Sequence, residues 1–131
     1  MSKKYKGLEI TEGQLKVQIE DYLQYQQNAG VLYWDRLNSG DFIEVRGDTR
    51  RRVRGCRKGT ADLIILKGGR TLFIELKGRS GRLRPEQRLF GELVQSQGSF
   101  YGVVRSLEEL MEVLSEEKLH KQSVQETGYR T

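Results

Sequence analysis

The 131-residue sequence predicts an α/β domain with a mixed central sheet flanked by helices, in the order α-β-β-β-β-α-β-α. Two observations predict this class. Apolar residues recur at helical spacing in three separate segments, and short β-branched or aromatic runs bounded by glycine lie between them. Hydrophobic residues make up 36% of the chain, which is enough for one modest core. We therefore expect residues 1–131 to form one domain, with its core at about residues 11–114.

The first helix is expected over residues 11 to about 29. Thr11 and Gln14 form a capping box at its start, and Gly30 is a natural stop at its end. Its apolar stripe consists of Leu15, Ile19, Tyr22 and Leu23.

Four strands are expected to follow in two hairpins. Residues 31–37 and 42–46 are apolar runs joined by a four-residue loop at 38–41. Residues 47–59 are basic and almost free of apolar side chains, which predicts a loop outside the core. Residues 61–67 and 70–77 flank Gly68-Gly69, the composition of a tight two-residue turn.

The remaining elements are a helix, a strand and a helix. After a polar linker at residues 78–84, Pro85 suits a first helical position, and a helix is expected to run to Gly98. Its apolar stripe consists of Leu89, Phe90, Leu93 and Val94. A short strand is expected at 99–104, and Ser106 is a plausible N-cap for the last helix. Residues from about 118 to 131 form a polar tail.

The positive charge of the chain is concentrated in one segment. Residues 46–88 contain fourteen Lys or Arg against four acids, a net charge of +10, while the rest of the chain carries −5. Such segregation favours a surface that binds a polyanion, most often nucleic acid. No apolar stretch reaches the length of a bilayer span, and a lone Cys56 and a single His120 exclude a disulfide scaffold and a structural zinc site. The expected location is therefore the cytoplasm.

The register of the second hairpin can be worked out from its turn. If Gly68 and Gly69 are the loop residues, Asp62 lies opposite Glu75, and opposite residues of an antiparallel pair project to the same face about 4.5–5.5 Å apart. The other face would carry an apolar layer of Leu63, Ile65, Leu72 and Ile74. The hairpin therefore predicts two facing carboxylates over a buried layer.

Two facing carboxylates repel each other unless a cation lies between them. Carboxylate oxygens suit Mg²⁺ or Mn²⁺, which keep several waters and bind substrate phosphates. Lys77 lies two residues beyond Glu75 and so shares its face. An ammonium there can hold an attacking water or neutralise charge that develops on a phosphate. The pattern indicates metal-dependent hydrolysis of phosphodiesters.

With these residues in place, the chain resembles the PD-(D/E)XK nuclease superfamily. The resemblance is carried by Gly-x-x-Asp-Leu-Ile at 59–64, Phe-Ile-Glu-Leu-Lys at 73–77 and a following helix that contains Gln87. Within the superfamily the chain looks like a stand-alone VRR-Nuc (virus-type replication-repair nuclease) domain of phages and bacteria, and it is similar to Holliday junction resolvases. The resemblance implies a restriction-endonuclease-like fold, α-β-β-β-(β)-α-β-α. The family's usual proline before the Asp is replaced here by Ala61.

The resemblance also implies roles for individual residues. Asp62 and Glu75 would bind the metal together with the backbone carbonyl of Leu76, Lys77 would be the catalytic lysine, and Gln87 would help to position the site.

A further acid is implied at the opening of the first helix. The run Thr-Glu-Gly-Gln-Leu at 11–15 makes Glu12 the outer metal ligand, with Glu20 as the rival. Resembling resolvases place a polar hairpin loop near the site, which adds Ser39 as a DNA contact.

The function expected is a structure-selective DNA endonuclease with one or two Mg²⁺ or Mn²⁺ ions per site. It would act on branched or four-way DNA as a homodimer. Basic side chains would bind backbone phosphates without reading sequence. These are Arg50, Arg51, Arg52, Arg54, Arg57, Lys58, Arg79, Arg82, Arg84 and Arg88. The alternatives are a non-catalytic nucleic-acid-binding module on a nuclease scaffold and a sequence-specific restriction subunit.

Overall fold

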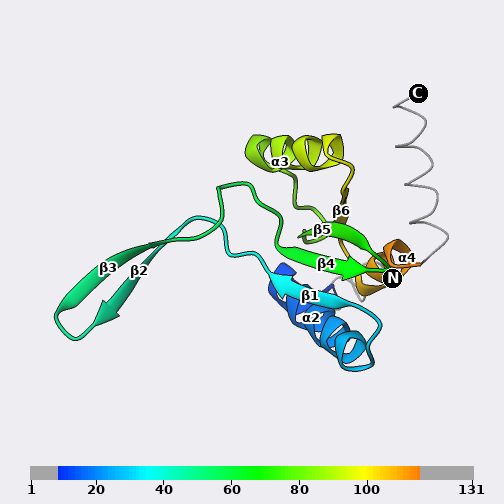
Figure 1. Cartoon of the computed structure of the whole chain (residues 1–131), viewed down its shortest axis with the longest axis horizontal. Coiled ribbons are helices and arrows are strands. Elements are labelled where there is room, and N and C mark those ends of the chain that lie inside the picture. Colours follow the sequence, from blue (N-terminus) through cyan, green and yellow to red (C-terminus); the bar gives the residue numbers. More distant parts are fainter. Residues whose placement is uncertain (1–8, 116–131) are drawn as a thin grey trace.

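A four-stranded mixed sheet with helices on both faces forms the body of the molecule, and a two-stranded ribbon projects from one end of it (Figure 1). The computed structural model describes residues 9–115, so the expected polar tail lies outside the described residues. The elements are α2 (Glu12–Asn28), β1 (Tyr33–Arg36), β2 (Asp41–Arg46), β3 (Thr49–Arg54), β4 (Leu63–Lys67), β5 (Arg70–Leu76), α3 (Pro85–Ser96), β6 (Phe100–Val104) and α4 (Leu107–Val113).

The central sheet has the strand order β1-β4-β5-β6. β1 and β4 pair antiparallel, as do β4 and β5, whereas β6 runs parallel to β5 because α3 lies between them in the sequence. The predicted α/β class with a mixed sheet is confirmed. The β4–β5 pairing runs from Leu63 opposite Ile74 to Lys67 opposite Arg70, which is the predicted register.

The first helix, α2, forms as its sequence predicts. The Thr11 hydroxyl accepts a hydrogen bond from the backbone N–H of Gln14 at 3.1 Å, and the Gln14 side chain accepts one from the backbone N–H of Thr11 at 2.8 Å. Leu15, Ile19 and Leu23 are fully buried on its inner face. The capping box thus fixes where α2 begins, and the apolar stripe fixes which side packs on the sheet.

The core lies between the sheet and the helices α2 and α4. Leu63, Ile65, Leu72 and Ile74 form the predicted apolar layer, and each has 0% of its surface exposed. Because neighbouring residues of a strand point to opposite faces, the alternate positions, including Phe73 and Glu75, lie on the other face, which α3 covers (Figure 1).

α3 uses only half of its predicted apolar stripe. Phe90 packs edge-on against Phe73 of β5 and Tyr101 of β6, with ring centroids 5.3 and 5.9 Å apart. Leu89 and Leu93 are more than half exposed, and the buried residues of α3 are instead Gln87 and Gly91. The helix therefore turns a glutamine and a glycine toward the sheet.

Gly91 is required where α3 approaches β6. A Cβ atom at this position would lie 2.8 Å from the ring of Tyr101, whereas one at Gly13 in α2 would meet nothing closer than 3.9 Å. We expect Gly91→Ala to lower the free energy of unfolding by about 1–3 kcal/mol through overpacking, and Gly13→Ala to raise it by about 0.5–1 kcal/mol because alanine favours a helix. Urea unfolding of both variants measures the two effects. A Gly91→Ala protein as stable as the wild type would contradict the packing described.

Two of the sequence predictions are wrong in the region between β1 and β4. Residues 31–37 and 42–46 do not form a hairpin: β1 pairs with β4, and β2 pairs with β3. The basic segment 47–59 is not a loop throughout, because it contains β3. Residues 9–115 contain one more strand than predicted, since the partner of β2 is a strand of arginines with no buried face.

We call β2, β3 and the Gly47–Asp48 turn between them the arm. Figure 1 shows the arm extending away from the sheet without covering it. Its two strands are joined at the base, where the N–H of Gly55 donates a hydrogen bond of 2.8 Å to the carbonyl of Gly40 and a bridge joins Ser39 to Cys56. A Cβ at Gly55 would lie 2.3 Å from the carbonyl oxygen of Asn38, so only glycine fits this contact.

Among residues 9–115, none of the helices is both long enough and apolar enough to cross a bilayer.

Candidate active site

Asp62 and Glu75 face each other at one end of the β4–β5 hairpin, on the face that α3 covers. An Asp62 carboxylate oxygen accepts a hydrogen bond of 2.7 Å from the backbone N–H of Leu76, which orients the aspartate toward β5. Glu75 is only 3% exposed, and its carboxyl group lies within the electrostatic influence of Asp62. The facing carboxylates predicted from the glycine turn are present.

The surroundings of Glu75 disfavour its charged form. Burial, then the charge of Asp62, then the hydrogen bond to Asp62 raise the pKa of Glu75 to about 8, while the ammonium of Lys77 opposes the shift. Glu75 therefore holds its proton at neutral pH when no metal ion is bound. A positive ion bound here would favour the charged form of Glu75 and so lower its pKa.

Lys77 and Gln87 both lie next to the Oε2 atom of Glu75. The Lys77 Nζ is 4.0 Å from it, and that side chain is only 12% exposed. The Gln87 side-chain amide donates a hydrogen bond of 3.2 Å to the same oxygen from α3. The structure thus brings together Asp62, Glu75, Lys77 and Gln87, although Asp62 precedes β4, Glu75 lies in β5, Lys77 follows β5 and Gln87 lies in α3.

Glu12 lies closer to the pair than its rival Glu20 does. Its Oε1 accepts a hydrogen bond of 3.3 Å from the N–H of Gly78, just beyond β5, and its charge raises the pKa of Glu75 further. Glu20 instead makes a bidentate ion pair with Arg36, at 2.7 and 2.9 Å. Glu20 is therefore committed to joining α2 to β1.

The donor set at the pair suits a hard divalent cation. The Oε1 atom of Glu75 is buried and accepts no hydrogen bond. A cation bound there would replace the interactions with water that this oxygen loses on burial. Within residues 9–115, no group of three His, Cys, Asp or Glu side chains converges closely enough to hold an ion by itself. Two carboxylates with water and substrate oxygens would complete the coordination that Mg²⁺ prefers.

Two residues near the site carry no signal in the sequence. The Tyr101 hydroxyl is buried without a partner, and burial, then Glu75, then Asp62 raise its pKa to about 12, so the phenol keeps its proton beside the carboxylates. The Arg105 guanidinium donates hydrogen bonds of 2.7 Å to the carbonyls of Gly78 and Gly81, and so holds the loop that follows Lys77. Both lie on or after β6, and only the parallel pairing of β6 with β5 brings them to the site.

A basic groove of about 610 Å³ lies where the base of the arm meets the start of α3. Gly59 lets the chain pass α3 closely, because a Cβ there would lie 2.4 Å from the carbonyl oxygen of Glu86. The groove is near the carboxylates, since the N–H of Leu37, at the foot of the arm, donates a hydrogen bond of 2.8 Å to the backbone carbonyl of Asp62. Its polar lining includes Ser39, Arg54, Arg57, Lys58 and Arg84.

The other basic residues singled out in the sequence are spread over three places. Arg50, Arg51 and Arg52 lie on the arm. Arg82 is exposed on the loop after β5, and Arg88 is exposed on α3.

Arg79 and Arg84 each have an acidic neighbour. Arg79 pairs with Glu9 at 2.5 Å, and Arg84 pairs with Glu86 at 3.1 Å.

Comparison with known proteins identifies the family. The chain matches the model of the VRR-NUC domain over residues 10–108, which cover the elements from helix α2 to strand β6. A search of curated proteins found no match. The mixed sheet, its flanking helices and their order agree with a nuclease of PD-(D/E)XK type. The chain therefore belongs to the VRR-NUC family of nucleases.

Proposed function

We propose that Asp62, Glu75 and Lys77 form the catalytic centre of a metal-dependent DNA endonuclease that hydrolyses phosphodiester bonds. The observation that carries the proposal is the facing carboxylate pair, with a buried Glu75 oxygen that lacks a donor and a lysine 4.0 Å from the other oxygen. Carboxylates and an ammonium in this arrangement suit hydrolysis of a phosphate ester better than any other chemistry the described residues offer.

The cofactor proposed is Mg²⁺ or Mn²⁺, as one or two ions. Asp62 and Glu75 would hold it together with the Leu76 carbonyl, and Glu12 would act as the outer acid through water. When bound, the ion would polarise the phosphate and lower the pKa of the attacking water. The chain's own contribution is to fix the acceptor oxygens: the Leu76 N–H orients Asp62, and the Gln87 amide orients Glu75.

Lys77 is proposed to act on the reacting atoms directly. Its ammonium is largely shielded from solvent and lies on the carboxylate face, where it can hold the attacking water or neutralise charge that grows on the phosphate. Gln87 is a positioning residue, because its amide contacts Glu75. The buried Tyr101 hydroxyl provides a neutral donor next to the same carboxylates.

The DNA is proposed to enter through the basic groove. Arg54, Arg57, Lys58 and Arg84 present cations there, with Ser39 at the rim, and Arg79, Arg82 and Arg88 lie on the elements that follow β5. These contacts favour backbone phosphates over bases, which supports structure-selective cleavage of branched or four-way DNA. A domain with one site that cuts two strands suits a two-fold pair, so a homodimer is proposed as well. Sedimentation at micromolar concentration tests this assembly, and a monomer under all conditions would contradict it.

The deciding experiment is cleavage of labelled linear, flapped and four-way DNA in chelator, Mg²⁺ or Mn²⁺. We expect scission with either metal and none in chelator, because without the ion nothing polarises the phosphate or lowers the pKa of the attacking water. Binding of DNA without metal-dependent scission of any substrate would favour the alternative, a non-catalytic nucleic-acid-binding module on a nuclease scaffold.

A further inference from the structure

The two faces of the arm differ in how their arginines are paired. Strand alternation and the register of β2 with β3 place Ile43, Val45, Arg50, Arg52 and Arg54 on one face, together with Asp41, and we call this the open face. The other face, which we call the paired face, carries Phe42, Glu44, Arg46, Thr49, Arg51 and Val53.

On the paired face both arginines contact an acid. Glu44 contacts Arg46 at 2.5 Å and Arg51 at 3.2 Å, so one carboxylate serves both guanidinium groups. On the open face Arg52 pairs with Asp41, but no acidic side chain of the described residues makes an ion pair with Arg50 or Arg54. The cations without partners therefore lie on one face only.

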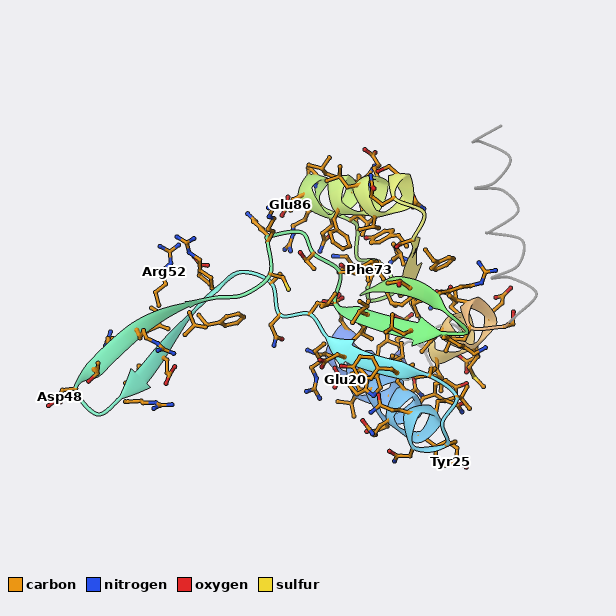
Figure 2. The ribbon with its side chains drawn as sticks, in the orientation of Figure 1. Glu20, Tyr25, Asp48, Arg52, Phe73 and Glu86 are labelled. Atoms are coloured by element: carbon orange, nitrogen blue, oxygen red, sulfur yellow. The ribbon has the colours of Figure 1, made fainter. Side chains whose placement is uncertain are left out.

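The arm is a ribbon of two strands, and no third strand extends it. A two-stranded hairpin with no third strand or helix against it is marginally stable in water. Ile43 and Val45 are 69% and 60% exposed, so the open face offers apolar side chains between its arginines. Figure 2 shows Arg52 and the turn residue Asp48 reaching away from the body of the molecule, with no other element beside them.

Charge favours DNA over a second copy of the chain on this face. In a symmetric dimer through the open face, the three arginines of one arm would meet the same three arginines of the other, and like charges in contact cost stability. A duplex offers two rows of phosphates, and its major groove is wide enough to admit a two-stranded ribbon. The arm also starts beside the basic groove and the carbonyl of Asp62. A duplex held at the carboxylates thus continues onto the arm.

We propose that the open face of the arm binds a segment of duplex DNA next to the cleavage site, and that Arg50 and Arg54 supply its phosphate contacts. The inference rests on the proposed nuclease function and extends its DNA contacts from the basic groove, which Arg54 also lines, along the arm to Arg50. The six residue pairs of the arm span about 20 Å at about 3.3 Å per residue, which matches about six base pairs at 3.4 Å each. The arm therefore enlarges the DNA site by about six base pairs.

The test compares two double variants that remove the same net charge from the same ribbon. Arg50→Gln with Arg54→Gln alters the open face, and Arg46→Gln with Arg51→Gln alters the paired face. Binding of labelled duplexes of 8 to 24 base pairs is measured in chelator, so that no strand is cut. We expect the open-face variant to bind about 10- to 30-fold more weakly and the paired-face variant at most about 3-fold more weakly. The slope of log affinity against log salt should fall by about 2 in the open-face variant alone.

The length series gives a second readout. For each protein, affinity should rise with duplex length and then level off. We expect the wild type to level off at a duplex about six base pairs longer than the open-face variant does. Equal losses in both variants, or an unchanged limiting length, would overturn the proposal. So would an open-face variant that dissociates a dimer while binding DNA normally, because the arm would then be a protein contact. These results are independent of cleavage, whose failure would instead contradict the proposed catalytic centre.

Discussion

Replacing Asp62 by asparagine is expected to lower kcat/KM for DNA cleavage by about 10³-fold or more. The substitution keeps an oxygen that can accept the hydrogen bond from the Leu76 N–H, so the loop before β4 retains its shape. It removes one of the two negative charges on which a divalent cation would bind, and several kcal/mol of transition-state stabilisation depend on that ion. Initial rates in saturating Mn²⁺ measure the loss.

The same variant should be more stable than the wild type when metal is absent. Asparagine ends the repulsion between the carboxylates and can donate a hydrogen bond to Glu75. In chelator we expect a rise in melting temperature of about 3–6 °C, which is the shift that about 1 kcal/mol gives in a chain of this size. Asp21→Asn, on the exposed side of α2, is the matched control and should change neither rate nor melting temperature. A variant of Asp62 that cleaves normally would exclude Asp62 from the catalytic centre.

The gain in stability should depend on pH. The pKa of Glu75 is about 8 in the folded, metal-free chain and close to its ordinary value in the unfolded chain. Between those values the folded state binds more protons, so the free energy of unfolding of the wild type falls as the pH rises from about 4.5 to about 8. The advantage of Asp62→Asn should therefore be larger at pH 8 than at pH 5. Urea unfolding in chelator at both values checks the sign.

Replacing Lys77 by methionine is expected to lower kcat by about 10²- to 10⁴-fold with little change in KM. Methionine keeps most of the buried stem of the side chain, so the packing survives, while the ammonium 4.0 Å from Glu75 is lost. A group that acts on the reacting atoms affects the chemical step by about this factor. The kcat and KM of the variant, measured in saturating metal, separate the chemical step from binding.

Lys67→Met is the matched control for Lys77→Met. Lys67 lies at the turn end of the same hairpin, opposite Arg70 and away from the carboxylates. Calorimetric titration with Mn²⁺ should show binding in both variants. If the two variants cleave DNA at the same rate, Lys77 has no catalytic role.

The sequence predicts the hairpin that carries the site because that hairpin is local. Two glycines set the turn, and with the turn fixed each residue of β4 has one partner on β5. The fully buried layer that includes Leu63 and Ile74 confirms the register, since a slip of one residue would turn it toward solvent. The position of Asp62 opposite Glu75 thus needed no knowledge of the rest of the fold.

The arm was missed because its strands have no buried face. Sequence patterns identify strands by alternation of apolar and polar side chains, and a ribbon with solvent on both sides need not alternate. The arginines of β3 therefore resemble a loop. Because β3 pairs with β2, β1 does not pair with β2 as predicted. The partner of β1 is β4, which begins 27 residues beyond the end of β1.

The residues that support the site from β6 and α3 were also beyond prediction, apart from Gln87, which the family resemblance implied. Tyr101 reaches the carboxylates because β6 runs parallel to β5 and because α3 offers Gly91 in place of a larger side chain. A parallel pairing between strands separated by a helix leaves no local signal in either strand.

The pairing of β1 with β4 makes the arm a removable module. Arg36 and Leu63 already face each other across the sheet and the bridge from Ser39 to Cys56 closes the base of the arm, so residues 40 to 55 leave the body and return to nearly the same point. The ribbon can accordingly gain or lose residue pairs without shifting a single strand of the catalytic scaffold. Chains built on this plan can lengthen their reach along a substrate while cutting it with an unaltered set of reactive groups.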